Sequence, residues 1–328
     1  MIAIVAALLA LLFGAFASEG PAPAAQVRPT ASATDAWKPL PHAGLERSEV
    51  GAARIGRSIY VVGGFVRPSD TSDAVERYDI DRRRWQRVAP MPVAVNHPAV
   101  AALGRFLYVY GGYTTSFEGI TGALQRYDPR SGEWTLLPPS PVKRAAAALA
   151  ARPGTLYAVG GANEDRELAT LEVYDVAAGR WHRAPSMRTP REHLAAVATA
   201  DGVYVLGGRA EGANLATVER FQPGRRRWLR LPDMRHARSG FAAVAVEGRP
   251  IAFGGEELTE DGATISPVEL FDPGERRWRP LAAMRTPRHG LGGAVLGRRI
   301  YAVEGGPRPG FAFSDAIEYL DVPARQLR

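Results

Sequence analysis

A unit of 47 to 51 residues recurs six times in this chain of 328 residues, and no other feature restricts its fold as strongly. Each copy carries a pair of glycines, and these pairs are Gly63-Gly64, Gly111-Gly112, Gly160-Gly161, Gly207-Gly208, Gly254-Gly255 and Gly305-Gly306. All the tryptophans of the chain follow the same spacing, and they are Trp37, Trp85, Trp134, Trp181, Trp228 and Trp278. A period of this length is typical of solenoids, propellers and arrays of small units.

Four short apolar runs make up each copy, and the fourth copy shows them clearly at residues 191–198, 203–208, 217–221 and 228–231. The runs have the length of strands, are rich in β-branched and aromatic residues, and are bounded by turn residues. No segment after residue 18 has sustained helical periodicity. Four antiparallel strands in each of six copies predict an all-β fold, a six-bladed β-propeller.

The two ends of the repeat region predict how the ring closes. The sixth copy stops at Arg328, where its tryptophan strand is due, whereas residues 37–40 form a tryptophan strand with no copy before it. We therefore expect the N-terminal strand from Trp37 to Leu40 to complete the last blade, which removes an exposed sheet edge.

The order of these motifs resembles the Kelch repeat: a basic residue, a small apolar strand, Tyr-x-x-Gly-Gly, Glu-x-Tyr-Asp and Trp. The resemblance covers residues 37–328 and implies a Kelch propeller, a family that includes both enzymes and interaction modules. Some copies depart from the pattern. Val95 replaces the basic residue in the second copy, and Glu304 stands as an extra residue before the last glycine pair, where we expect a β-bulge.

The first 36 residues differ from the repeats. Residues 1–17 are uncharged and apolar and end in Ala15-Phe16-Ala17, which predicts a secretory signal peptide. No basic residue precedes the apolar run, so an uncleaved anchor stays open as an alternative. Residues 18–36 are rich in Ala, Pro, Ser and Thr and predict a disordered linker. We expect a secreted or periplasmic protein whose mature chain, residues 37–328 above all, has no membrane span.

Composition restricts the partners and the chemistry. The net charge is +7, but acidic residues are interspersed with the basic ones and no nucleic-acid motif is present, so we expect no nucleic-acid partner. The chain has no cysteine, which excludes disulfides, thiolate metal sites and cysteine nucleophiles. It also excludes the copper chemistry of the galactose oxidase family, whose cofactor needs a cysteine cross-linked to tyrosine. We predict that the protein uses no cofactor and is a monomer or homodimer.

Antiparallel geometry places the start of the first strand and the end of the second on one face of the ring. This predicts a channel mouth lined by the basic position of each copy, with Val95 in the sixth place: Arg47, Arg144, Arg191, Arg238 and Arg288. Neighbouring candidates for ligand binding are Asn96, Tyr113, Arg209, Glu256 and His289. Guanidinium groups grip carboxylates and phosphates, and interaction-type Kelch domains imply an acidic peptide partner. The alternative is that each arginine binds carbonyls of the adjacent blade, or Glu192 and Glu256.

Three histidines, His97, His193 and His289, fall in alternate copies. Three imidazoles are enough ligands for zinc. However, His289 lies one register off the other two relative to its arginine, and no carboxylate is evidently fixed beside them. We therefore predict no metal site.

Two functions remain in view. The favoured one is an exported binding protein that uses the arginine-lined mouth for an acidic protein segment or an anionic glycan. The alternative is a periplasmic sugar epimerase resembling the N-acetylneuraminate mutarotases, with Glu256 as the candidate catalytic residue because it directly follows a glycine pair. That family's arginine a few residues further on is absent, since residues 262–264 are Gly-Ala-Thr.

Overall fold

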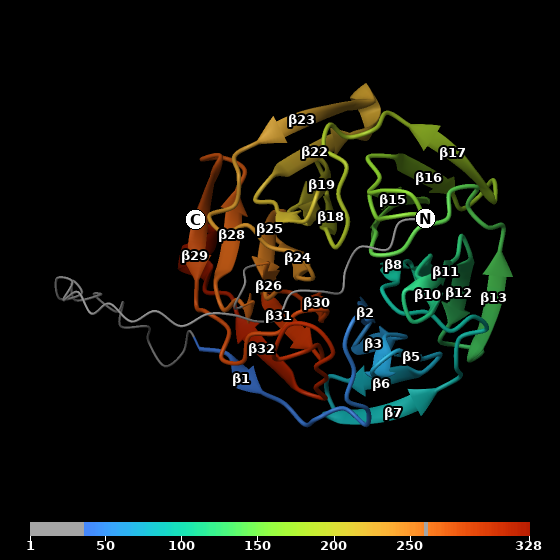
Figure 1. The fold of residues 1–328 in the computed structure, drawn as a ribbon. Coiled ribbons are helices and arrows are strands. Elements are labelled where there is room, and N and C mark those ends of the chain that lie inside the picture. Colours follow the sequence, from blue (N-terminus) through green and yellow to red (C-terminus); the bar gives the residue numbers. More distant parts are fainter. Residues whose placement is uncertain (1–35, 259–261) are drawn as a thin grey trace, which may run out of the picture. The chain divides into compact units, whose positions relative to one another are not determined.

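Six four-stranded antiparallel sheets form the part of the chain that the structure, a computed structural model, describes: residues 36–258 and 262–328. Figure 1 shows the sheets as blades placed around a common centre, in the order of the sequence. This confirms the predicted six-bladed propeller. The predicted signal peptide, almost all of the predicted linker and part of the acidic loop after Gly255 lie outside the described residues.

Each blade runs from an innermost to an outermost strand. Blades one to three consist of β2 (Gly51–Ile55), β3 (Ser58–Val62), β6 (Val75–Asp79) and β7 (Arg84–Val88); β8 (Ala99–Leu103), β9 (Phe106–Tyr110), β12 (Leu124–Asp128) and β13 (Glu133–Leu137); and β14 (Ala148–Arg152), β15 (Thr155–Val159), β16 (Leu171–Asp175) and β17 (Arg180–Ala184). Blades four to six consist of β18 (Ala195–Thr199), β19 (Gly202–Leu206), β22 (Val218–Gln222) and β23 (Arg227–Leu231); β24 (Ala242–Val246), β25 (Arg249–Phe253), β28 (Val268–Asp272) and β29 (Arg277–Leu281); and β30 (Gly292–Leu296), β31 (Arg299–Val303), β32 (Ile317–Asp321) and β1 (Lys38–Pro39).

Short hairpins extend four of the blades beyond the glycine pairs, on the face that holds the loops before the innermost strands. They are β4–β5 (Phe65–Arg67, Asp70–Thr71), β10–β11 (Tyr113–Thr115, Glu118–Ile120), β20–β21 (Arg209–Ala210, Ala213–Asn214) and β26–β27 (Glu256–Glu257, Ala263–Thr264). Two short 3-10 helices, Pro223–Arg225 and Ala324–Leu327, complete the regular structure of the described residues, and none of their helices is long and apolar enough to cross a membrane.

The N-terminal strand closes the ring as predicted. β1 pairs antiparallel with β32, with Lys38 opposite Tyr319. Trp37 is buried, and its Nε1–H donates to the carbonyl oxygen of Ala282 in blade five at 3.0 Å. The last blade therefore joins both ends of the repeat region through backbone hydrogen bonds.

The tryptophans connect each blade to the preceding blade by a hydrogen bond. In every blade the indole Nε1–H donates to a carbonyl oxygen at the end of the preceding blade, as Trp181 does to Pro138 at 3.0 Å. The others are Trp37 to Ala282, Trp85 to Pro41, Trp134 to Ala89, Trp228 to Pro185 and Trp278 to Pro232. Apolar side chains of neighbouring sheets fill the space between blades, such as Tyr110 of blade two against Trp181 of blade three, whose ring centroids lie 5.2 Å apart. The core is therefore a set of interfaces between blades, as the repeated aromatic positions predicted.

The glycine pairs serve backbone geometry. Both glycines of the first pair have positive φ, +64° at Gly63 and +86° at Gly64, and a Cβ on either would lie within 2.4 Å of a backbone oxygen. Blade six corrects one prediction. Gly305 N–H donates to the carbonyl oxygen of Arg47, as the second glycine of blade one, Gly64, donates to the carbonyl oxygen of Val95. Gly305 is therefore the second residue of its pair, and Glu304, with φ +54°, occupies the place of the first glycine. Glu304 is therefore a substitution within the repeat, and the expected bulge is wrong.

Candidate functional site

The five arginines predicted to line the mouth are completely buried within the blades. Arg191 shows the arrangement: its Nη2 lies 2.6 Å from Glu219 Oε1, and its Nη1 donates to the carbonyl oxygens of Gly207 and Thr217 in the same blade. The corresponding pairs are Arg47–Glu76, Arg144–Glu172, Arg238–Glu269 and Arg288–Glu318, at 2.8 to 3.2 Å. The prediction that these guanidinium groups face the opening is wrong. Each has a glutamate partner in the third strand of the same blade, and Arg47 also pairs with Glu304 of blade six at 2.9 Å, so the alternative with Glu192 and Glu256 is wrong too.

Blade two shows why the arginines are structural. Where the other blades have the arginine, it has Val95, which is fully buried, and where they have the glutamate it has Gln125. The Gln125 amide makes two hydrogen bonds to the backbone of Val93: Oε1 accepts from the Val93 N–H at 2.9 Å, and Nε2 donates to the Val93 carbonyl oxygen at 3.0 Å. The guanidinium and its carboxylate are thus replaced together, as expected for a buried pair in which neither charge is tolerated alone.

A closed ring of backbone hydrogen bonds surrounds the centre at the foot of the mouth. The third residue of the loop before each innermost strand takes part, and these six residues are Glu49, His97, Ala146, His193, Gly240 and Gly290. In five of them, all except Glu49, the N–H donates to the carbonyl oxygen of the collar residue in the preceding blade, from His97 to Glu49 through to Gly290 on Gly240. Val50 N–H then closes the ring on Gly290. We call this ring the collar.

All six collar residues have a left-handed backbone, with φ between +49° and +59°. Glycine adopts this conformation freely, but Glu49, His97 and His193 are strained in it by about 1 kcal/mol each. Because the ring of hydrogen bonds imposes the conformation, the side chains of these residues project from fixed positions toward the centre.

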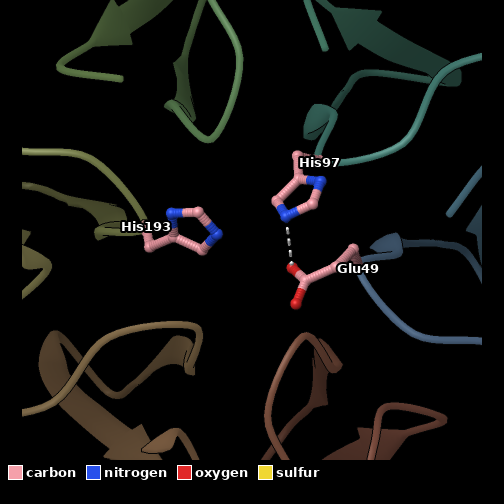
Figure 2. A group of neighbouring side chains, drawn as sticks. All are labelled: Glu49, His97 and His193. Carbon is pink, nitrogen blue, oxygen red and sulfur yellow. Dashed lines mark ion pairs between the residues drawn. The ribbon is translucent and has the colours of Figure 1, made fainter. Parts of the chain in front are cut away.

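Figure 2 shows that Glu49, His97 and His193 point toward one another from blades one, two and four. His97 Nε2 lies 3.3 Å from Glu49 Oε2, and one ligand-type atom from each residue lies within 4.8 Å of the others. Burial alone raises the pKa of Glu49, but the neighbouring His97 and His289 rings hold that pKa below its usual value. Burial lowers the pKa of His97 to about 4. The expectation that no carboxylate is fixed beside these histidines is therefore wrong.

Second contacts orient both histidine rings. His97 Nδ1 lies 2.6 Å from Asn96 Oδ1. His193 Nδ1 contacts a carboxylate oxygen of Glu192, whose other oxygen accepts a hydrogen bond from Arg209 Nε. Although burial opposes the effect, His193 and Arg209 lower the pKa of Glu192 to about 2, so this carboxylate is ionised at neutral pH. In both rings Nε2 is left to face the centre.

His289 joins the group from the second position of its loop, one register before the collar. Its Nδ1 lies 3.2 Å from Glu49 Oε1 and 3.7 Å from Glu256 Oε2. Burial lowers the pKa of His289, but Glu49 and Glu256 outweigh it and raise that pKa above its ordinary value. The register difference was predicted correctly, yet it leaves the ring beside Glu49.

A cavity of about 280 Å³ opens above these residues, and we call it the mouth cavity. Its floor holds Glu49, His97, His193 and His289, and its walls include Arg209 and Glu256. Its rim is aromatic and apolar, formed by Phe65, Phe117, Leu258 and Phe311. A second hollow of about 110 Å³ lies beneath the collar, lined by apolar and small residues together with the same Glu49, His97 and His193.

Two rim phenylalanines are exposed: 54% of Phe117 and 46% of Phe311. Their rings lie 5.9 Å apart, and each lies 5.5 Å from the buried Phe65 ring. Large apolar side chains that cluster at the edge of a cavity are typical of a binding surface.

The predicted site residues divide into three groups. Arg209, Glu256 and His289 line the mouth cavity, where sequence reasoning placed them. Asn96 is buried and holds His97, and Tyr113 pairs with Asn96 and packs edge-on against His97 at 5.5 Å. The five arginines lie in the blades. Sequence reasoning missed Glu49, Phe117 and Phe311 as site residues and set aside His97 and His193. The shared third loop position of Glu49, His97 and His193 was the available signal.

The fold, the repeated motifs and the mouth define a Kelch-type β-propeller. The family model for the KLHDC2/KLHL20/DRC7 Kelch-repeats domain matches residues 49–255, and the chain therefore belongs to the Kelch-repeat family.

Relatives with known names match only part of this chain. It is 38% identical to Kelch-like protein 15 of Gallus gallus over 80 residues, which are 24% of this chain and 16% of that protein. It is 36% identical to Kelch-like protein terF of Aspergillus terreus over 86 residues, 23% of this chain and 18% of that protein. The chain thus matches less than a fifth of the length of these relatives. The solved structure of YjhT is similar in fold, with a TM-score of 0.74 over 84% of this chain and 95% of that chain, at 16% identity.

Proposed function

We propose that this Kelch propeller is a binding protein that takes an apolar segment of a partner protein into its mouth cavity. The observation that carries the proposal is the exposed pair Phe117 and Phe311 above a cavity of about 280 Å³. A Kelch propeller is consistent with a role in protein binding. In protein interfaces, most of the binding energy comes from a few residues, often aromatic, that pack in desolvated pockets.

The charges of the cavity favour a neutral or basic segment over an acidic one. Among the described residues that line it, the carboxylates of Glu49 and Glu256 face the guanidinium of Arg209, which Glu192 and Glu256 already engage, and the imidazole of His289, which contacts both of the lining carboxylates. The charge of each of the five buried arginines is neutralised by its glutamate partner within the blade, so these arginines add no positive potential at the opening. An acidic peptide or anionic glycan therefore loses its main support.

A peptide-display selection against the purified protein tests the proposal. We expect enrichment of peptides with a central aromatic or aliphatic residue and no acidic flank. We also expect Phe117→Ala and Phe311→Ala each to weaken binding by about 5- to 150-fold, the effect of removing about 1–3 kcal/mol of aromatic contact. Leu136→Ala is the matched control, because Leu136 is as exposed (57%) but lies on the outermost strand β13 of blade two. Equal binding by both phenylalanine variants and the wild type would refute the proposal.

A sugar epimerase is the second candidate, because the Glu256 carboxylate lines the cavity beside His289 and Arg209 and is available for proton transfer. Proton NMR of freshly released sialic acid tests it. Faster anomer exchange that is lost in Glu256→Gln supports an epimerase, and exchange at the uncatalysed rate contradicts it.

Export from the cytoplasm is also a proposal, supported by the apolar segment 1–17 and its Ala15-Phe16-Ala17 ending. N-terminal sequencing of the protein recovered from the producing cells checks it. A mature chain that begins at Ser18 supports a cleaved signal peptide, and an intact N-terminus in the membrane fraction supports the anchor.

A further inference from the structure

We propose that Glu49, His97 and His193 bind a divalent transition-metal ion, with zinc as the reference ion, at the floor of the mouth cavity. The three side chains come from blades one, two and four and offer two imidazole nitrogens and one carboxylate, the donor set of many three-ligand zinc and iron sites. The observations behind this inference do not depend on the partner proposed above, although a bound cation would offset the carboxylate charge of the same cavity.

Hydrogen bonds around Asn96 fix which nitrogen of His97 is free. Asn96 Nδ2 donates to Thr71 Oγ1 and to the carbonyl oxygen of Ser116, both at 2.7 Å. Since the amide nitrogen is engaged there, Asn96 Oδ1 accepts from His97 Nδ1 at 2.6 Å. In the neutral ring, Nε2 then presents a lone pair to the Glu49 carboxylate at 3.3 Å. Two acceptors that face each other need a cation between them.

His193 is oriented in the same way by a carboxylate. Its Nδ1 contacts Glu192, which Arg209 holds in place, so the proton of the neutral ring lies on Nδ1. Metal-binding histidines almost always donate their other N–H to a carboxylate or carbonyl, which fixes the ring and raises the basicity of the ligating nitrogen. Both histidines here have that second contact, and each leaves Nε2 toward the cluster.

The spacing suits a small ion. Tetrahedral zinc with bonds of about 2.1 Å separates its ligands by about 3.4 Å. His97 Nε2 and Glu49 Oε2 are already 3.3 Å apart, and all three donors lie within 4.8 Å of one another. Binding therefore requires side-chain movements of about 1 Å, while the collar holds the backbone. Because three protein ligands leave positions open, and the mouth cavity lies directly above, water or a ligand group can complete the coordination.

Neighbouring collar residues leave room for the cluster. A Cβ on Gly290 would lie 2.5 Å from Glu49 Oε1, so only glycine at this position lets the carboxylate occupy its place. His289 Nδ1, at 3.2 Å from the same oxygen, contacts the side of the carboxylate that His97 does not. Glu49 Oε2 is thus directed at His97, and one oxygen of the same carboxylate lies within 4.8 Å of a ring nitrogen of His193.

Isothermal titration of the full-length protein with zinc chloride, after chelator treatment and dialysis, tests the site. We expect one zinc ion per chain, with binding weakened at least 100-fold in His193→Ala and in Glu49→Gln. His182→Ala is the matched control, because His182 is exposed on the outermost strand β17 of blade three, and its affinity should stay within 2-fold of the wild type. Asn96→Ala removes the second contact of His97, together with the Asn96 hydrogen bonds to Thr71 and Ser116, but leaves all three ligands in place, and it should weaken binding about 10-fold.

Cobalt substitution gives a second readout that does not depend on how well a ligand variant folds. We expect wild-type protein loaded with Co²⁺ to show visible absorption bands of a site with nitrogen and oxygen ligands, displaced by equimolar zinc. Circular dichroism of each variant separates loss of the site from loss of the fold. The proposal is overturned if the folded wild type takes up neither ion, or if binding survives unchanged in both His193→Ala and Glu49→Gln. In that case a proton, not a metal, lies between His97 and Glu49.

Discussion

Replacing one buried arginine–glutamate pair by the residues of blade two tests the assignment of the arginines to the fold. Arg191→Val alone leaves the Glu219 carboxylate, which is 1% exposed, without its charge partner. It also removes the donors to Gly207 and Thr217. Breaking a buried ion pair on one side costs about 3–5 kcal/mol, so we expect the free energy of unfolding to fall by about 4 kcal/mol.

The double variant Arg191→Val/Glu219→Gln should recover most of this loss. In blade two, Gln125 bonds the backbone N–H and carbonyl of Val93. The equivalent residue in blade four is Thr189, whose N–H faces Glu219 and whose carbonyl accepts from Arg191 Nε. The glutamine can therefore replace both contacts without leaving a charge, and we expect a net cost of about 1–2 kcal/mol.

Urea denaturation followed by tryptophan fluorescence and circular dichroism measures these changes, with Glu219→Gln alone completing the cycle. We expect a coupling free energy of at least about 2 kcal/mol between the two positions. A cost below 1 kcal/mol for Arg191→Val, or a double variant whose loss equals the sum of the single losses, would show that the pair does not hold the blade together. Unchanged peptide binding in the double variant is also expected, because Arg191 does not reach the mouth cavity.

Three further predictions concern the contacts between blades, the buried Glu304 and the collar. Trp181→Ala removes the indole donor to Pro138 and a half-buried ring, so the free energy of unfolding should fall by about 3 kcal/mol; an unchanged Tm would contradict the placement. Burial raises the pKa of Glu304 to about 7, although the charge of Arg47 acts to lower that pKa. The contribution of Glu304 to stability is therefore full below about pH 4.5 and is lost as the pH rises through 7. The Tm of Glu304→Gln should fall less than that of the wild type over this range, and parallel profiles of Tm against pH would contradict the raised pKa. Gly290→Ala places a Cβ against Glu49 at φ +55° and should cost about 2–3 kcal/mol in denaturant titrations, whereas the same change at the open Gly212 tip, which also has positive φ, should cost only about 1 kcal/mol; equal losses would refute crowding at Glu49.

The architecture could be predicted from the sequence because its signals are local and repeated. The tryptophan of each copy makes the same hydrogen bond to the preceding blade, so its spacing reports the blade directly. Trp37 revealed the closure because it marks a tryptophan strand at the N-terminus that has no copy of the repeat before it.

The role of the arginines could not be settled by their position alone. A residue at the start of the innermost strand can point to the channel or into the blade, and only the third-strand partner decides between them. That partner is the glutamate of the Glu-x-Tyr-Asp motif. In blade two the arginine and this glutamate are both replaced, by Val95 and Gln125, and this joint change indicates that the two residues pair.

The cluster at the floor was missed because its three residues are 48 and 96 positions apart and share only a loop register. Nothing local in the sequence marks Glu49 as facing His97, since the collar that brings them together consists of backbone hydrogen bonds between blades. Similarly, reading the last glycine pair literally placed Glu304 outside the repeat, whereas its backbone partner shows that it replaces a glycine.

The central claim is that the collar residues, not the arginines, carry the chemistry of the mouth. Anomalous diffraction at the zinc edge from crystals grown with zinc tests it most directly. We predict a single strong peak about 2.1 Å from His97 Nε2, His193 Nε2 and a Glu49 oxygen. No peak there in zinc-saturated crystals, with His97 in direct hydrogen-bond contact with Glu49, would contradict the assignment of a metal site to Glu49, His97 and His193.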